Sequence, residues 1–321
     1  MGRCLVCAST GEGRAPWSCL DRQLRSRHCI LAAGPFDSVR RGRYGASMRV
    51  HHLNCATMCP PLGRWAIGAP GRLPAHCLLV ETPRSGLVLV DTALGLGDIA
   101  DPRRLGPSRA MLGAVLDPAE TALRQVEALG FSPSDVRHIV LTHLDLDHAG
   151  GVGDFPWADV HVLAAEHDAA RARRTLAERS RYRPAHVDAV PEGRWRLHST
   201  DGEAWMGLPA ARELAGLEGF ALVPLVGHTR GHAGVAVHSD RGWLLHVGDA
   251  VMHGDALLGR RIHPGLAAFQ WASAVERCVA RQTRDTIARW LAGPGASVRA
   301  FCAHDAGALA ALQAEATATR Q

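Results

Sequence analysis

Short continuous apolar runs recur along the chain, and each is followed by a histidine or an aspartate. Apolar runs of four to six residues bounded by glycine are typical of strands that are buried on both faces. Side chains at the ends of such strands stand on a rigid scaffold, which suits a site whose geometry must be held closely. The runs and the residues they lead to are, in chain order, 87–90 before Asp91, 136–141 before His143, 222–227 before His228, 243–248 before Asp249 and 298–303 before His304.

Helical periodicity alternates with these strands. An amphipathic helix is expected over 118–130, where Pro118 marks its start and Gly130 its end. A second helix is expected around 164–178, directly after a strand at 160–163. Three strand-like pieces punctuated by glycine and proline come earlier, at 49–53, 75–81 and 86–91. The alternation predicts an α/β protein with several buried strands.

Residues 180–220 have weak periodicity and lie between the segment that contains His143 and the run that ends at His228. They either cover the site or form a plain surface insertion. If they cover the site, their aromatic side chains would give it an apolar wall. Those side chains are Tyr182, Trp195, Trp205 and Phe220.

The 321 residues carry a formal net charge of +5, and the first 47 residues account for all of it with eight arginines against three acids. The rest of the chain is neutral overall, so a basic surface for nucleic acid is not expected. Residues 1–47 also hold four of the nine cysteines and lack hydrophobic periodicity. We expect this segment to be a disordered extension, or the result of a start assigned upstream of Met48. A single domain is then expected over 48–321.

The first 47 residues contain no apolar stretch long enough for a signal peptide or a membrane span, so a cytoplasmic protein with no membrane partner is expected. The cysteines after Met48 lie in apolar contexts, and we expect them to be reduced and buried. They are Cys55, Cys59, Cys77, Cys278 and Cys302.

Four side chains that could bind a metal fall within six positions, at His143, Asp145, Asp147 and His148. Two carboxylates and two imidazoles on one turn are costly to fold without cations, because their charges must be compensated or their pKa values must shift. A divalent ion removes the problem, since it binds neutral imidazole nitrogens and carboxylate oxygens. The segment is therefore a candidate active-site loop.

Taken together, the motifs resemble those of the metallo-β-lactamase-fold hydrolases. The chain carries Thr-His-x-Asp-x-Asp-His-x-Gly-Gly at 142–151, Gly-His-Thr-x-Gly-His at 227–232, Gly-Asp at 248–249 and a late strand-terminal His304, in the order that the family has them. The resemblance covers about residues 48–310. It implies an αββα four-layer sandwich.

The resemblance also implies two divalent metal ions and assigns residues to them. His143, Asp145 and His228 would bind the first ion, and Asp147, His148 and His304 the second. Asp249 would bridge both ions. Asp91 would orient a ligand histidine through its other ring nitrogen, and His232 would lie near the site without binding metal.

One position departs from the family's commonest pattern, His-x-His-x-Asp-His. Asp145 stands where that pattern has its second histidine. Zinc is still expected at this site. A carboxylate is a harder ligand than an imidazole, which makes manganese and iron the alternatives. If Asp145 instead points away from the site, only one ion would bind.

The implied chemistry is hydrolysis by a hydroxide that bridges the two ions. Asp249 would set the spacing of the ions, and Asp147 would help to relay a proton to the leaving group. The chain has no Gly-x-Ser-x-Gly elbow for a serine nucleophile, which agrees with this chemistry.

A small carboxylic ester or lactone is the expected substrate. A thioesterase of the glyoxalase II type and a mononuclear iron dioxygenase of the same fold are the alternatives. β-Lactams are not expected, because the enzymes best known for that activity have a cysteine or serine where this chain has Asp249. Met252 stands where acyl-homoserine lactonases carry a tyrosine, which would leave the oxyanion to be stabilised by the metal alone or by the neighbouring His253.

Overall fold

The structure is a computed structural model that describes residues 48–68 and 70–318. The extension expected at 1–47 lies outside the described residues. The first described strand, β1, begins at Arg49, directly after Met48.

The first sheet has seven strands in the order β4-β1-β2-β3-β5-β6-β7. The strands β1, β2 and β3 pair antiparallel, whereas β3, β5, β6 and β7 run parallel. Parallel neighbours place their carboxyl ends at one edge of the sheet. The bounds are β1 Arg49–Met58, β2 Leu73–Glu81, β3 Leu87–Val90, β4 Ala114–Val115, β5 Val136–Val140, β6 Asp159–Leu163 and β7 Trp195–His198.

The second sheet has five strands in the order β10-β11-β12-β13-β14. All its pairs are antiparallel except β13 with β14. A separate hairpin joins β8 and β9. The bounds are β8 Gly202–Trp205, β9 Leu208–Ala210, β10 Arg212–Glu213, β11 Phe220–Pro224, β12 Ala233–Ser239, β13 Gly242–His246 and β14 Arg299–Phe301.

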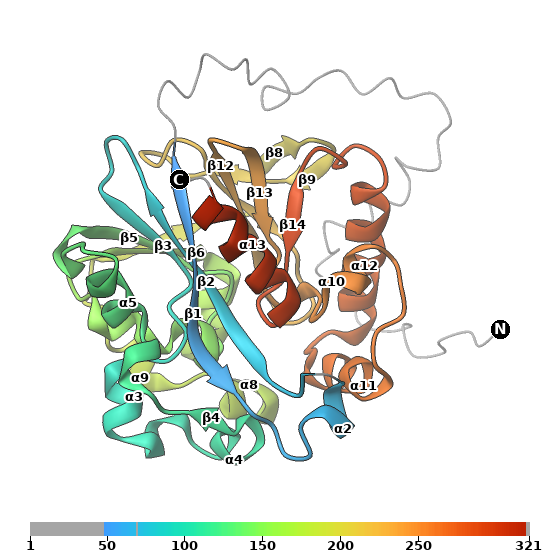
Figure 1. The fold of residues 1–321 in the computed structure, drawn as a ribbon, viewed down its shortest axis with the longest axis horizontal. Coiled ribbons are helices and arrows are strands. Elements are labelled where there is room, and N and C mark those ends of the chain that lie inside the picture. The colour runs from blue at the N-terminus through green and yellow to red at the C-terminus, as the bar shows by residue number, and fades with distance from the viewer. Residues whose placement is uncertain (1–47, 69, 319–321) are drawn as a thin grey trace.

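Helices connect the strands and lie outside the two sheets (Figure 1). The α-helices are α2 Arg64–Ile67, α3 Leu96–Ala100, α4 Ser108–Leu112, α5 Ala122–Ala128, α6 Leu146–Ala149, α7 Ala164–Ala172, α8 Leu176–Arg181, α9 Pro184–Val187, α10 Gly254–Leu257, α11 Pro264–Ser273, α12 Arg277–Leu291 and α13 Ala306–Ala318. The 3₁₀ helices are η1 Pro102–Leu105, η2 Pro118–Glu120, η3 Pro133–Asp135, η4 Gly150–Asp154 and η5 Gly248–Ala250.

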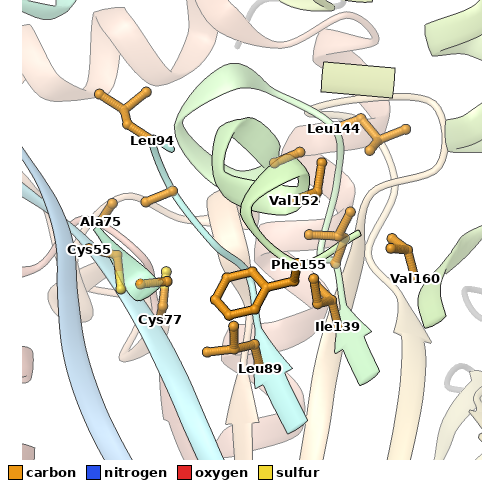
Figure 2. Close-up of a cluster of buried hydrophobic side chains, with 14 of the residues drawn as sticks. Cys55, Ala75, Cys77, Leu89, Leu94, Ile139, Leu144, Val152, Phe155 and Val160 are labelled. Atoms are coloured by element: carbon orange, nitrogen blue, oxygen red, sulfur yellow. The ribbon is translucent and has the colours of Figure 1, made fainter. Parts of the chain in front are cut away.

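Three apolar clusters separate the layers. The continuous apolar strands divide their side chains between two faces, as the two-residue period of a strand requires. In β3, Val88 and Val90 face the cluster between the two sheets, whereas Leu87 and Leu89 face the cluster under α5 and η4. Figure 2 shows Phe155, which follows η4, lying against Leu89 in that second cluster. A third cluster joins the outer face of the second sheet to α10 and α12. The expected αββα four-layer sandwich is confirmed.

The expected strands at 49–53, 75–81, 86–91 and 160–163 are all present. The helix expected over 118–130 is a 3₁₀ turn followed by α5. The single helix expected around 164–178 is wrong, because the segment forms α7 and α8. Arg173 ends α7 in the left-handed region at φ 43°, and Thr175 starts α8 with a capping box completed by Glu178.

The aromatic wall expected from the 180–220 insertion is wrong. Tyr182, Trp205 and Phe220 are fully buried in the core rather than in a site. Phe220 packs between the sheets and Trp205 lies 5.5 Å from the ring of Trp290. Trp195 on β7 packs against His167, with ring centroids 4.9 Å apart. The aromatic side chains of the insertion pack against the rest of the domain, because burying them stabilises the fold more than exposing them would.

Two smaller expectations concern membranes and cysteines. None of the helices in the described residues has the length and apolar composition needed to cross a bilayer. Cys55, Cys77 and Cys302 are buried free thiols, as expected. The expectation of burial is wrong for Cys278, which is exposed on α12. Cys59 is only half-buried.

Candidate metal centre

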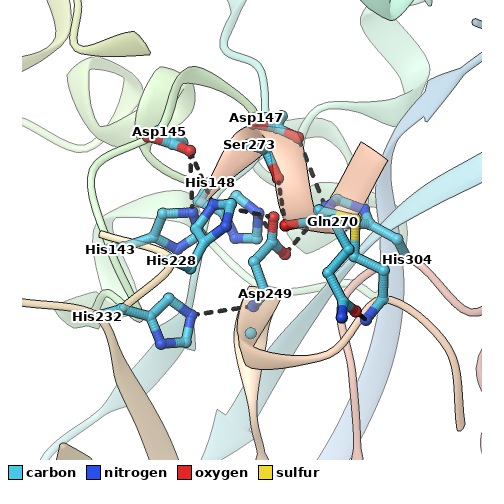
Figure 3. A network of polar contacts seen from close by, with 12 residues as sticks. His143, Asp145, Asp147, His148, His228, His232, Asp249, Gln270, Ser273 and His304 are labelled. Carbon is cyan, nitrogen blue, oxygen red and sulfur yellow. Dashed lines mark hydrogen bonds and ion pairs between the residues drawn. The ribbon is translucent and has the colours of Figure 1, made fainter. Parts of the chain in front are cut away.

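Five loops at neighbouring strand ends bring the predicted site residues together. The parallel strands β3 and β5 supply Asp91 and the segment 141–148, since their carboxyl ends lie side by side. The second sheet supplies the rest from β11, β13 and β14. Figure 3 shows these side chains converging on Asp249.

Close backbone packing holds the first of these loops. Asp145 precedes the one-turn helix α6, which carries Asp147 and His148. The turn after β3 packs directly against α6, because the N–H groups of Thr92 and Ala93 both donate to the carbonyl of His148. A Cβ at Gly150 or Gly151 would come within 2.8 Å of backbone oxygens in that turn. The Gly-Gly pair of the motif is therefore needed for the approach of two loops.

Two groups of side chains could each hold a metal ion among the described residues. The first group is His143, His228 and Asp249, and the second group is Asp147, His148 and His304. Within each group, the ligand atoms all lie within 4.8 Å of one another. Asp145 is not a member of the first group, but its Oδ2 lies 3.4 Å from His143 Nε2 and 3.2 Å from His228 Nε2. It therefore points toward this group rather than away from it.

Hydrogen bonds at Nδ1 fix the orientation of three imidazoles. Thr142 donates its hydroxyl hydrogen to Asp91, 2.8 Å away, so the same hydroxyl accepts from His143 Nδ1 at 3.0 Å. His148 donates from Nδ1 to Asp91 at 2.8 Å, and His304 donates to the carbonyl of Pro74 at 2.8 Å. In each ring, the Nε2 lone pair then faces the centre. This is the arrangement that protein groups impose on metal-binding histidines.

Asp91 accepts a hydrogen bond from His148, and its backbone adopts an uncommon conformation. The residue has a φ of 56°, in the left-handed region that few residues other than glycine adopt readily. Its second oxygen accepts the N–H of Thr142 at 2.8 Å. One buried carboxylate thus holds His148 and, through Thr142, His143.

The donor atoms fit a pair of metal ions. His143 Nε2, His148 Nε2, Asp145 Oδ1 and Asp249 Oδ1 are buried and have no hydrogen-bond partner within the described part of the chain. Such orphaned polar atoms are costly unless a ligand satisfies them. Two ligands of one tetrahedral zinc ion, each bonded at about 2.0–2.1 Å, are about 3.3 Å apart. Asp249 Oδ2 lies 3.5 Å from His228 Nε2, and Asp249 Oδ1 lies 3.3 Å from His148 Nε2 and 3.0 Å from His304 Nε2.

Asp249 thus presents one oxygen to each group. Its backbone N–H donates to His232 Nε2 at 3.0 Å, while His232 Nδ1 donates to the carbonyl of Leu225. Both ring nitrogens of His232 thus have hydrogen-bond partners. Burial, with the nearby His143 and His228, holds the pKa of His232 well below its usual range, so the ring is neutral and can accept.

The charges of the centre are strongly coupled. Burial alone would raise the pKa of the Asp249 carboxyl, but the imidazoles of His304 and His148 hold it well below its usual range. Burial would lower the pKa values of these two imidazoles, yet the Asp249 carboxylate raises both. Positive charge beside the carboxylates of the centre therefore stabilises their ionised form, and bound cations would supply such charge.

Two residues at the centre were not predicted from the sequence. Glu166 on α7 is fully buried and joins two of the loops, because it accepts the N–H groups of Leu144 and Gly231, each at 3.0 Å, and the hydroxyl of Tyr182. Arg181 at the end of α8 lies with its Nη1 3.2 Å from Asp145 Oδ2. No local pattern distinguishes either residue, since each reaches the centre only through the fold.

A cavity of about 420 Å³ opens beside His304. Its lining is mixed, with apolar Ile67, Leu73 and Leu266 beside Met252 and His253. The N–H of Met252 donates to Gln270 Oε1 at 2.9 Å. The cavity thus touches the second group, and it falls within the size range of small-molecule sites.

Comparison with known protein families identifies relatives of the chain. A family model described as the metallo-β-lactamase superfamily matches residues 70–286. A probable metallo-hydrolase of Mycobacterium tuberculosis is 49% identical over 220 residues, which make up 67% of this chain and 66% of that protein. The chain thus spans 66% of the length of this curated relative.

More distant relatives have a stated substrate. An N-acyl homoserine lactonase of Rhizobium johnstonii is 36% identical over 102 residues, or 32% of this chain and 38% of that protein. The solved structure of an N-acyl homoserine lactone hydrolase, with the product N-hexanoyl-L-homoserine at its catalytic metal centre, matches with a TM-score of 0.61. That match covers 83% of this chain and 95% of the other at 19% identity, so it shows that the two chains share a fold.

Proposed function

The chain belongs to the metallo-β-lactamase superfamily, and from this premise we propose that it is a metal-dependent hydrolase of carboxylic esters or lactones. The observation that carries the proposal is the pair of donor groups, His143, His228 and Asp249 beside Asp147, His148 and His304. Asp249 belongs to the first group, and its Oδ1 also lies 3.3 Å from His148 Nε2 and 3.0 Å from His304 Nε2 in the second.

The proposed ligands follow the two groups. His143, Asp145 and His228 would hold the first ion, and Asp147, His148 and His304 would hold the second. Asp249 would contact both ions. A pair of divalent ions bound there would supply an activated water and would polarise the carbonyl of the substrate.

The protein side chains provide position and proton transfer. Asp249 would set the spacing of two bound ions, since its oxygens face different groups. Asp147 is less buried than Asp249 and lies 3.6 Å from His304 Nε2. In this proposal its carboxylate would hold a proton for the leaving group.

The substrate class rests on the cavity and on the relatives. Ile67, Leu73 and Leu266 offer an apolar surface for the non-reacting part of a substrate. The lactonases among the relatives act on a substrate with an acyl chain, according to their names. Both features favour a lactone or an ester with a medium apolar chain.

A substrate panel tests the proposal. Lactones, aryl esters, glutathione thioesters, bis-aryl phosphodiesters and phosphotriesters would be assayed with zinc-loaded and manganese-loaded protein, with His304→Ala as the inactive control. We expect the highest kcat/KM on a lactone or an aryl ester. Faster turnover of a glutathione thioester would favour a thioesterase, and preference for a phosphodiester would contradict carbonyl chemistry.

Metal analysis of protein purified without added metal tests the cofactor. We propose two ions per chain, with zinc as the principal occupant. One equivalent of iron without zinc would instead favour an oxygenase of the same fold.

A further inference from the structure

A buried arginine accompanies the unusual carboxylate of the first group. Arg181 Nη1 lies 3.2 Å from Asp145 Oδ2, the same oxygen that faces His143 and His228. The Arg181 side chain is only 12% exposed. Asp145 and Arg181 therefore form a charge pair that is shielded from water and is stronger than an exposed pair.

The guanidinium is held in place from three directions. Besides Asp145, it donates to the carbonyl of His228 at 3.2 Å and to the carbonyl of Ser273. Its backbone lies at the end of α8, which starts at the capping box of Thr175 and Glu178. Arg181 thus links the loop of Asp145 with the loop of His228 and the end of α11.

The charge of the pair explains why an aspartate is tolerated at this position. The Asp145 carboxylate is buried, and Arg181 Nη1 lies 3.2 Å from its Oδ2. A carboxylate in place of a neutral imidazole adds one negative charge to a centre that already contains Asp147 and Asp249. Arg181 supplies one positive charge at the same place. Burying a charge without such a partner is expensive.

From this geometry we propose that Arg181 is a positioning residue for the first metal site. It orients the Asp145 carboxylate toward His143 and His228 and offsets the charge that this carboxylate adds. Positions 145 and 181 therefore depend on each other. With aspartate at position 145, metal binding at the first site requires Arg181, whereas with histidine at position 145 the arginine would weaken it. The inference rests on the proposed metal ligands.

A double-mutant cycle tests this unit, because only a true pair shows coupling. The full-length chain would be compared as wild type, Arg181→Met, Asp145→His and the double variant. Zinc affinity would be measured by competition with a chromophoric chelator, and the cobalt(II) absorption spectrum would report the ligand geometry. His304→Ala identifies which of the two dissociation constants belongs to the first site.

We expect Arg181→Met to weaken zinc binding at the first site about 10-fold in the wild type, and to strengthen it in the Asp145→His background, since the arginine there faces a cation without a counter-charge. Arg181→Lys, which keeps the charge but loses the planar fork, should weaken binding less. The matched control is Arg183→Met, because Arg183, the residue that precedes α9, is similarly buried but donates to Ser108 and to the carbonyl of Ser180. It should leave both constants within about twofold, well below the coupling expected of interacting residues.

Equal effects of Arg181→Met in the two backgrounds would overturn the proposal, as would an effect no larger than that of Arg183→Met. If Arg181→Met does not fold, Arg181→Lys with Asp145→His completes the cycle, and the same equality contradicts the pairing. Wild-type protein that binds no zinc would contradict the proposed function itself. Zinc binding without coupling would contradict only the role of Arg181.

Discussion

The two donor groups of the centre are supported in different ways. In the second group, His148 donates to the carboxylate of Asp91 and His304 donates to the carbonyl of Pro74. In the first group, His143 donates only to the hydroxyl of Thr142, and the charge partner is Arg181 instead of a carboxylate. One group is thus surrounded by acceptors, and the other has a cation beside it.

This difference has a consequence for metal affinity. A carboxylate or carbonyl that accepts from Nδ1 makes the imidazole a better ligand. A guanidinium near the first group opposes a bound cation, although it steadies Asp145. We therefore expect the second site to bind its ion more tightly than the first, and the predictions below test this order.

The largest effect is expected where the two groups meet. Asp249→Asn removes the charge that faces both groups, since Oδ2 lies 3.5 Å from His228 and Oδ1 3.0 Å from His304. We expect both ions to be lost or weakened together and turnover to fall by about 100-fold or more, because metal activation of water is lost. Metal content and kcat would be measured on the same samples. Loss of one ion alone would show that Asp249 belongs to a single site.

Single-ligand variants should separate the two groups. We expect His304→Ala and His228→Ala each to remove about one ion, the former from the tighter site and the latter from the weaker site. Isothermal titration with zinc after chelation would give the remaining constant in each variant. Matching residual constants would mean that the two sites are equivalent and would remove the basis of the comparison.

The grouping of the candidate metal-binding side chains could be predicted from the sequence, because these residues follow strand ends. An apolar run that leads to His143 or Asp249 predicts a strand and also predicts that this side chain lies at the end of the strand. Six candidate ligands fall into two compact groups in the structure. The two glycines of the first motif were visible as well, although only the fold shows that they allow the turn after β3 to approach α6.

The remaining features depend on contacts between distant segments. Arg181 and Glu166 are ordinary helix residues by sequence, and they become parts of the centre only when α7 and α8 pack against the loops. Trp205 is buried in the third cluster because it packs against Trp290, which lies 85 positions later in the chain. The sequence around Trp205 does not reveal this contact. A single sequence carries no local signal for such pairings.

A smaller effect is expected from the acceptor behind the second group. Asp91→Asn keeps the shape but weakens the acceptor for His148, so we expect zinc affinity at the second site to fall by about 10–100-fold, the usual scale for such partners. The first site should change less, because Asp91 reaches it only through Thr142. Competition titrations would resolve the two constants. An equal loss at both sites would mean that Asp91 supports the whole loop rather than one ligand.

The smallest expected effect concerns stability rather than metal. Glu166 lies under the first group, where Oε1 accepts from Leu144 and Tyr182 and Oε2 accepts from Gly231. In Glu166→Gln, the amide nitrogen must face at least one of these donors, so a buried hydrogen bond becomes a contact between two donors. We expect the free energy of unfolding of the metal-free protein to fall by about 2 kcal/mol, within the range for lost hydrogen bonds to a charged group. Urea unfolding measures it, with exposed Glu192→Gln as the control. An unchanged unfolding midpoint would show that Glu166 does not hold the two loops together.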